Sequence, residues 1–166
     1  MKKTFFIQGI CLAALMFLML GTSFAQPTQV YHHPTLNIQF EAPPNWMQIP
    51  HPEDQTIYEL VSLDTTIHVI VFHRVTSQDG LAYVKNLALL KQLKPKGEPV
   101  KKIIKGKEAF EVEASGLIKQ KPIRMIITAL PFEKGFFIVQ IWSPEQNFMN
   151  YQQMMRNIQG SLGITG

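Results

Sequence analysis

The stretch FFIVQIWSPEQNFMNYQQMMRNIQ, residues 136–159, decides the fold because it joins two different apolar periodicities. Its first seven residues are almost entirely apolar, which is typical of a strand that is covered on both faces. After it, Ser143 is a candidate helix cap, Pro144 suits a first helical turn, and Glu145 suits the positive helix end. Residues 145–159 are therefore predicted to form a helix with one apolar stripe facing the sheet, made by Phe148, Tyr151, Met155 and Ile158.

Working back from this stretch, the pattern predicts an antiparallel meander of four strands. These strands are residues 100–105, 108–117, 123–130 and 136–142. A type II′ turn at Gly106 and Lys107 joins the first two, and it places Ile103 opposite Phe110 and Lys102 opposite Glu111. Consecutive apolar residues in the third strand indicate that helices cover the sheet on both faces.

Earlier residues complete a single domain. Alternation predicts strands at residues 35–42, 58–62 and 67–72, and a helix follows at 80–93, with Ser77 or Asp79 as its cap. The predicted fold class is α+β, with an antiparallel sheet of about six to seven strands and helices on both faces, an α/β/α sandwich. The domain spans residues 35–166, and residues 26–34 are a flexible lead-in with two prolines.

Residues 1–25 have the pattern of a secretory signal peptide. Lys2 and Lys3 precede an apolar run at 10–20, and small residues lead to a cleavage point after Ala25. The protein is thus expected to be exported, periplasmic or secreted, and an uncleaved membrane anchor is the alternative. Because Cys11 is the only cysteine, the mature chain has no disulfide, thiol nucleophile or thiolate metal site.

Composition narrows the function classes. The 166 residues are 46% hydrophobic and 17% charged, which excludes an unfolded chain and a multi-span membrane protein. The formal charge of +4 falls to +2 without the two leader lysines. The chain contains no G-x-S-x-G, S-x-x-K or phosphate-loop motif, so we expect no enzyme and no cofactor.

Two segments carry a resemblance to a known family. One is a strand that ends in an aromatic residue and continues to tryptophan, FEAPPNW at 40–46, and the other is the strand, Ser-Pro-Glu and final helix of 136–161. Together they resemble the PsbP-like family, whose fold is shared with the Ran-binding Mog proteins. The resemblance implies an exported bacterial binding or assembly module. The lysine-bearing N-terminal segment of photosynthetic members has no match at 26–35, which argues against a photosystem-accessory role.

Lysines gather in residues 91–107, where Glu98 is the only acid. Such a run suits an acidic envelope protein or an anionic membrane surface, and a solvated edge that resists aggregation is the alternative. It lacks arginine and interleaved aromatic residues, so nucleic acid is not expected as a partner. The candidate partner-binding residues are Lys94, Lys96, Lys101, Lys102, Lys105 and Lys107.

A carrier of a small ligand or lipid in the periplasm is the alternative function. It would need a pocket between the last helix and the sheet. The aromatic and methionine side chains that could line this pocket are Phe137, Trp142, Phe148, Tyr151 and Met155.

Histidines and paired acids offer weaker candidates. His32, His33 and His51 could hold a metal if the lead-in folded back, but solvated loop histidines are the favoured interpretation. Glu111 and Glu113 share one face of a strand, as a glycosidase pair would, and we expect instead a solvated face opposite lysines.

Overall fold

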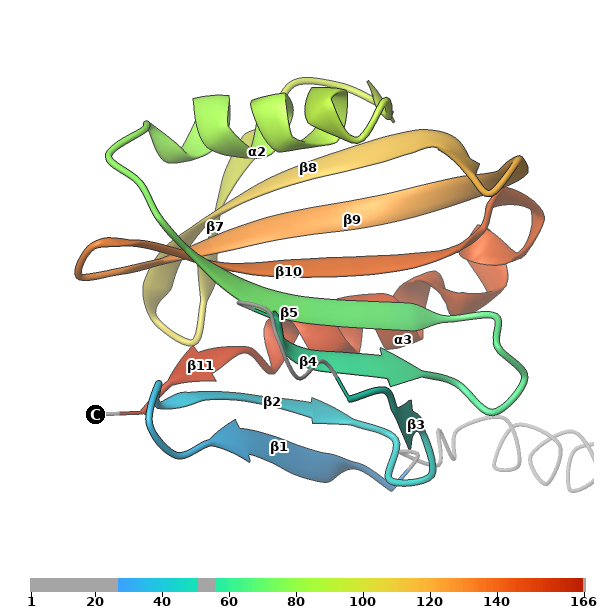
Figure 1. The fold of residues 1–166 in the computed structure, drawn as a ribbon, viewed down its shortest axis with the longest axis horizontal. Helices are drawn as coiled ribbons and strands as arrows, with labels where there is room; N and C mark the ends of the chain where they lie inside the picture. The colour runs from blue at the N-terminus through green and yellow to red at the C-terminus, as the bar shows by residue number, and fades with distance from the viewer. Residues whose placement is uncertain (1–26, 51–55, 166) are drawn as a thin grey trace, which may run out of the picture.

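The computed structural model describes residues 27–50 and 56–165. The predicted leader and His51 lie outside the described residues. Within them the chain forms two antiparallel sheets and two α-helices (Figure 1).

The larger sheet has eight strands, all antiparallel. The order is β3-β4-β5-β10-β9-β8-β6, and β7 pairs with β8 beside β6. The strands are β3 (Met47–Gln48), β4 (Thr56–Val61), β5 (His68–Val75), β6 (Lys94–Pro95), β7 (Val100–Ile104), β8 (Lys107–Ile118), β9 (Lys121–Phe132) and β10 (Gly135–Pro144). The expected meander is confirmed as β7 to β10.

A second sheet corrects the expected start of the domain. It has three strands in the order β1-β2-β11, which are β1 (Gln29–His33), β2 (Ile38–Ala42) and β11 (Gly163–Ile164). The segment expected to be a flexible lead-in thus contributes a strand that pairs with β2 along its whole length. Burial of Tyr31, whose ring stacks 5.3 Å from that of Phe40, fixes β1 to the core. The total strand number exceeds the expected six to seven.

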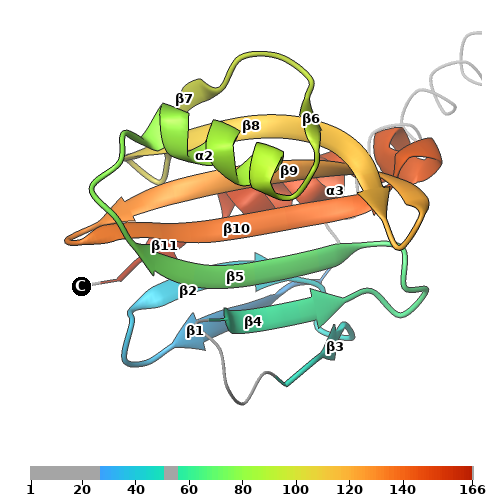
Figure 2. The ribbon, with the colours of Figure 1, turned by 45° about the horizontal axis from the view of Figure 1, so that its top comes forward.

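The helices lie on opposite faces of the larger sheet, which confirms the α/β/α arrangement (Figure 2). Helix α2 (Gly80–Leu90) begins at Asp79, whose carboxylate accepts hydrogen bonds from two backbone N–H groups, as expected of a cap. Helix α3 (Phe148–Gly160) follows a 3₁₀ turn, η1 (Glu145–Asn147). Ser143 is not the expected cap, because it belongs to β10 and its hydroxyl donates only to the next carbonyl.

The two faces are covered to different extents. On one face, α3 and the small sheet together bury β4, β5, β9 and β10. On the other face, α2 packs on β8 and β9 and leaves the β4–β5 side without a helix (Figure 2). The residues of β5 that point to this second face, His68, Ile70 and Phe72, are accordingly only half-buried.

The hairpin of β7 and β8 has a register two residues from the expected one. Its turn is Lys105 and Gly106, with φ of 46° and 78°, so Ile103 faces Glu108. Positive φ at both central residues is typical of a type I′ turn, which, like the expected type II′ turn, matches the right-handed twist of the strands. A shift of two residues keeps every side chain on its face.

Candidate functional site

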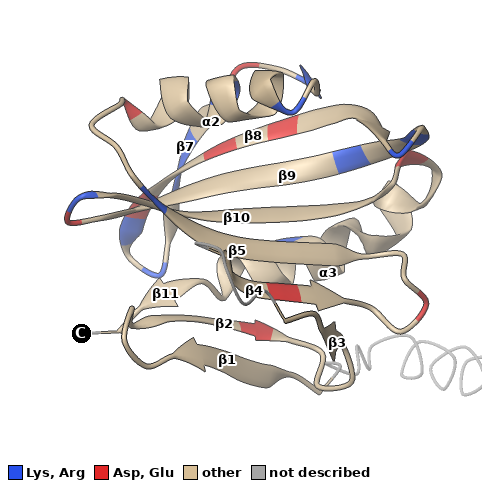
Figure 3. Ribbon diagram, viewed as in Figure 1, with Lys and Arg blue, Asp and Glu red and all other residues tan. Residues whose placement is uncertain are grey.

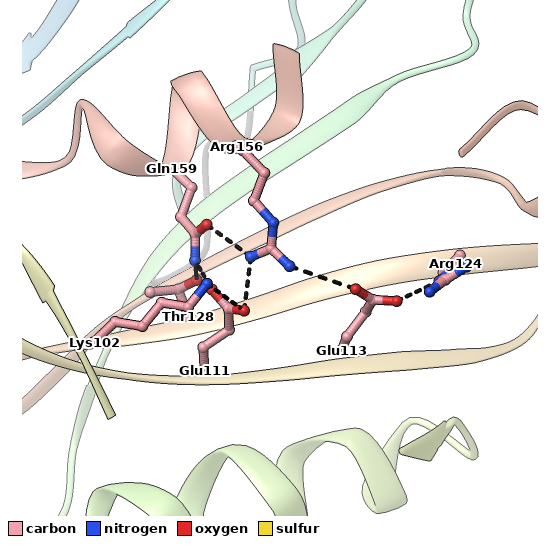
Figure 4. Close-up of polar contacts among 7 residues, drawn as sticks. All are labelled: Lys102, Glu111, Glu113, Arg124, Thr128, Arg156 and Gln159. Carbon is pink, nitrogen blue, oxygen red and sulfur yellow. Dashed lines mark hydrogen bonds and ion pairs between the residues drawn. The ribbon is translucent and has the colours of Figure 1, made fainter. Parts of the chain in front are cut away.

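A buried carboxylate lies between α3 and the larger sheet. Glu111 on β8 is 4% exposed, and its carboxylate forms ion pairs with Lys102 at 2.9 Å and Arg156 at 2.7 Å. The side-chain amide of Gln159 donates a further hydrogen bond to it (Figure 4). Odd-numbered residues of β8 point to the α3 face, so the expectation that this carboxylate is solvated is wrong.

The same contacts extend to a second carboxylate. Glu113 accepts from Arg124 and from the second Arg156 nitrogen, the latter at 3.4 Å (Figure 4). Arg124 also lies 4.4 Å above the ring of Phe148. With Thr128, which accepts from Gln159 at 2.7 Å, these residues form one connected set. We call it the charge network: Lys102, Glu111, Glu113, Arg124, Thr128, Arg156 and Gln159.

The charge network favours the ionised state of Glu111. Burial raises the pKa of Glu111, but hydrogen bonds from Gln159, Lys102 and Arg156 outweigh it, so the pKa is lowered. A glycosidase needs one carboxyl with a raised pKa to act as the acid. The network therefore fastens α3 to the sheet and does not resemble an acid–base pair.

The six candidate lysines lie along one edge of the larger sheet, on β6, the loop after it, β7, the following turn and the first residue of β8 (Figure 3). Three of them face carboxylates: Lys96 pairs with Glu145 at 3.4 Å, Lys101 with Glu108 at 3.2 Å, and Lys102 joins the charge network. The other three form no ion pair within residues 27–50 and 56–165, and they are Lys94, Lys105 and Lys107. The positive charge of this edge is thus partly neutralised, and its role as a partner surface stays a prediction.

The five residues expected to line a ligand pocket do not share one. Phe137, Phe148 and Met155 are fully packed in the core between α3 and the sheet. Trp142 points to the opposite face of the sheet, where its ring stacks 4.8 Å from that of His68. Tyr151 alone lines a surface groove.

The two described metal candidates take separate roles. The Nδ1 atom of His33 accepts a hydrogen bond from the backbone of Leu36 at 3.2 Å, and His32 lies 3.4 Å from the Thr165 hydroxyl. No group of three or more histidine, cysteine or acidic residues gathers in the described part of the chain. His51 lies outside it, so the full set stays a hypothesis.

An open groove of about 520 Å³ lies where α3 meets two connecting loops. Pro43, Pro44 and Trp46 line it from the β2–β3 loop, and Leu63 and Asp64 line it from the β4–β5 loop. Helix α3 lines the groove with Tyr151 and Met154, and Ile67 lines it just before the start of β5. We call this the proline groove; its remaining lining residues are Pro27, Asn45 and Ser62.

Among residues 27–50 and 56–165, Asp64 is the only charged residue that lines the proline groove. Its carboxylate accepts from the hydroxyls of Ser62 at 2.6 Å and Thr66 at 2.7 Å, and from Tyr151 at 3.3 Å. The hydrogen bonds from Ser62 and Thr66 lower its pKa to about 2. The groove therefore carries a fixed negative charge at neutral pH between proline and aromatic surfaces.

Sequence reasoning missed the proline groove, because its residues come from separate segments of the chain, with 87 positions between Asp64 and Tyr151. The available signal was the pair of prolines and the tryptophan between two strands.

The described residues contain no helix long and apolar enough to cross a membrane.

No protein-family model matches the sequence, and no curated protein matches it. Solved structures share its fold. Cyanobacterial PsbP (CyanoP) from Synechocystis sp. PCC 6803 has a TM-score of 0.66 at 10% identity, with 87% of this chain and 96% of that chain covered. LpqN, involved in cell envelope biogenesis of Mycobacterium tuberculosis, has a TM-score of 0.58 at 14% identity, with coverages of 84% and 91%. The chain has the PsbP/Mog-like fold that the resemblance implied, and identities this low speak to fold alone.

Proposed function

We propose that this chain is an exported, non-catalytic binding module that docks an extended, basic and apolar segment of another envelope protein in the proline groove. The observation that carries the proposal is the groove itself, about 520 Å³ in volume and walled by prolines, Trp46 and Tyr151. Aromatic-lined grooves suit extended segments of polyproline II conformation, which is preformed and therefore loses little conformational entropy on binding.

The charge of the proline groove determines which kind of segment it binds. Asp64 stays ionised at neutral pH because its pKa is about 2, and no cation lines the groove among the described residues. A lysine or arginine of the partner would meet this carboxylate beside an aromatic ring, where cation–π attraction adds to the ion pair. An acidic segment would instead be repelled.

Two further observations support an envelope module without catalysis. The leader pattern at residues 1–25 supports export, and one protein with this fold takes part in cell envelope biogenesis. The paired carboxylates that most resemble catalytic acids are held by cations in the charge network. This supports a binding role over acid–base chemistry.

Photo-crosslinking in the native envelope tests the proposal. A benzoyl-phenylalanine at Leu63, which is 69% exposed in the groove, is compared with one at Leu117, which is similarly exposed outside it. We expect Leu63 alone to crosslink to one partner segment. Equal products from both positions, or none from Leu63, contradict the proposal.

The crosslinked segment is then made as a peptide and titrated against the purified protein with tryptophan fluorescence. We expect Asp64→Asn to weaken binding about ten-fold, and a peptide with glutamates in place of its basic residues not to bind. Because Asp64 is ionised above about pH 2, binding should persist down to about pH 3. Binding that is unchanged in Asp64→Asn would refute the assigned role of the groove.

A further inference from the structure

A second groove runs beside α2 on the opposite face of the larger sheet. Its volume is about 610 Å³, and its lining residues come from α2, from the end of β5 and from the loop between them. Figure 2 shows that α2 leaves the β4–β5 side of the sheet without a helix. One side is apolar, with three leucines from the second half of α2. The other side is polar, and the full lining is Arg74, Gln78, Tyr83, Asn86, Leu87, Leu89 and Leu90.

The apolar side is exposed to an unusual degree. Leu90 is 81% exposed, the highest value among the large apolar side chains of the described residues, and its neighbour Leu89 is 54% exposed. Adjacent exposed leucines next to a groove are typical of a surface that is covered by an apolar ligand.

The polar side presents one cation that lies over an aromatic ring. The guanidinium of Arg74 lies 5.6 Å above the ring of Phe72 and forms no ion pair within the described ranges. Phe136, the register partner of Arg74 on β10, stacks 5.3 Å from the ring of Tyr83. Burial raises the pKa of Tyr83, so its hydroxyl stays protonated and able to donate. Two donors beside one uncompensated positive charge fit a carboxylate.

The backbone around the groove argues against a peptide as occupant. Strand β5 pairs on both edges, with β4 and with β10, and the α2 backbone hydrogen-bonds internally. A peptide lying here would leave most of its own N–H and C=O groups without partners, at a cost that an alkyl chain does not meet. A ligand with one polar end satisfies the groove better than a chain with polar groups throughout.

We propose that the α2 groove binds a fatty acid, with its carboxylate on Arg74 and Tyr83 and its alkyl chain along Leu87, Leu89 and Leu90. This site is separate from the proline groove, and it does not depend on the function proposed above. The groove volume lies within the range of small-molecule sites. The carrier role expected from sequence thus has a candidate place in the structure, at residues other than the five expected.

Calorimetric titration of the purified protein with dodecanoate, below its micelle concentration, tests this site. We expect saturable binding that weakens about ten-fold in Arg74→Gln, since the charged hydrogen bonds are lost. Leu90→Gln should weaken it as well, whereas Leu117→Gln, at an exposed position outside the groove, should not. Circular dichroism confirms that each variant is folded.

The matched ligand is dodecyltrimethylammonium, which has the same chain and the opposite charge. It should bind far more weakly than dodecanoate. Equal binding of the two ligands, or dodecanoate affinity unchanged in Arg74→Gln, would show surfactant adsorption only and overturn the proposal. Absence of saturable dodecanoate binding, or capture of an acidic peptide in its place, would overturn it too.

Discussion

Replacing Arg156 with methionine tests whether the charge network fastens α3 to the sheet. The guanidinium bridges Glu111 at 2.7 Å and Glu113 at 3.4 Å, and methionine keeps much of its apolar stem while removing both contacts. Removing one partner of a fully buried ion pair costs about 3–5 kcal/mol. Because the Arg156 side chain is 26% exposed and Glu111 keeps Lys102 and Gln159, we expect a smaller loss, about 2–3 kcal/mol.

Urea unfolding followed by tryptophan fluorescence measures this loss as a lower midpoint with an unchanged slope. In a thermal scan the same loss lowers Tm by about 5–10 °C for a domain of this size. Lys101→Met is the matched control, because its pair with Glu108 is exposed and should contribute less than about 0.5 kcal/mol. If Arg156→Met costs no more than Lys101→Met, the network does not stabilise the docking of α3 and the reasoning fails.

Three other outcomes are expected. Because the pKa of Glu111 is lowered in the folded state, its contribution to the free energy of unfolding is complete above its unfolded pKa near 4.5. This contribution is lost as the pH falls through the lower folded pKa. Glu111→Gln should therefore flatten the acid branch of the curve of unfolding free energy against pH. Burial lowers the pKa of His68, so its titration midpoint measured by NMR should lie below 6.5. In Trp142→Leu, which removes the stacked ring and admits water, the midpoint should return toward 6.5. An unshifted midpoint in the unmodified protein argues against the stacked pair. A Cβ on Gly135 would lie 1.9 Å from a β5 carbonyl oxygen, so Gly135→Ala should lower the free energy of unfolding by about 1–3 kcal/mol. A Cβ on Gly160 would meet no atom of the described residues within 4 Å beyond its chain neighbours and the backbone of its own helix, so Gly160→Ala should not lower it. Equal effects of the two substitutions in urea unfolding would contradict this.

Local patterns were sufficient for most elements of the fold. Alternation and helical periodicity predicted the meander, both helices and the two covered faces, because each signal lies within one element. The β7–β8 register needed more than pattern, since two candidate turns share Gly106, begin one residue apart and keep every side chain on the same face of the sheet. Strand β1 was missed because only one of its five side chains, Tyr31, is buried.

The charge network was hidden from sequence reasoning for a different reason. Glu111 and Glu113 alternate with apolar residues exactly as solvated side chains do, and their burial depends on polar residues of α3. Arg156 and Gln159 lie on one helix face beside the apolar stripe, which is the signal that polar groups also face the sheet. A search for acidic residues on one face of a strand, together with basic residues beside the apolar stripe of a helix, would have identified the charge network.

The pairing of β11 with β2 has a consequence for how the chain reaches its fold. Gly163 lies opposite Gln39, and the Ser161 hydroxyl accepts from the Glu41 backbone at 2.7 Å, although these residues are 120 positions apart. In a chain that emerges N-terminus first, from a ribosome or a translocation pore, β2 can pair with β1 early, but its other edge stays unpaired until β11 has emerged. Such high contact order slows folding and keeps the early strands open to chaperones. The small sheet can therefore be completed only after β11 has emerged, long after β1 and β2.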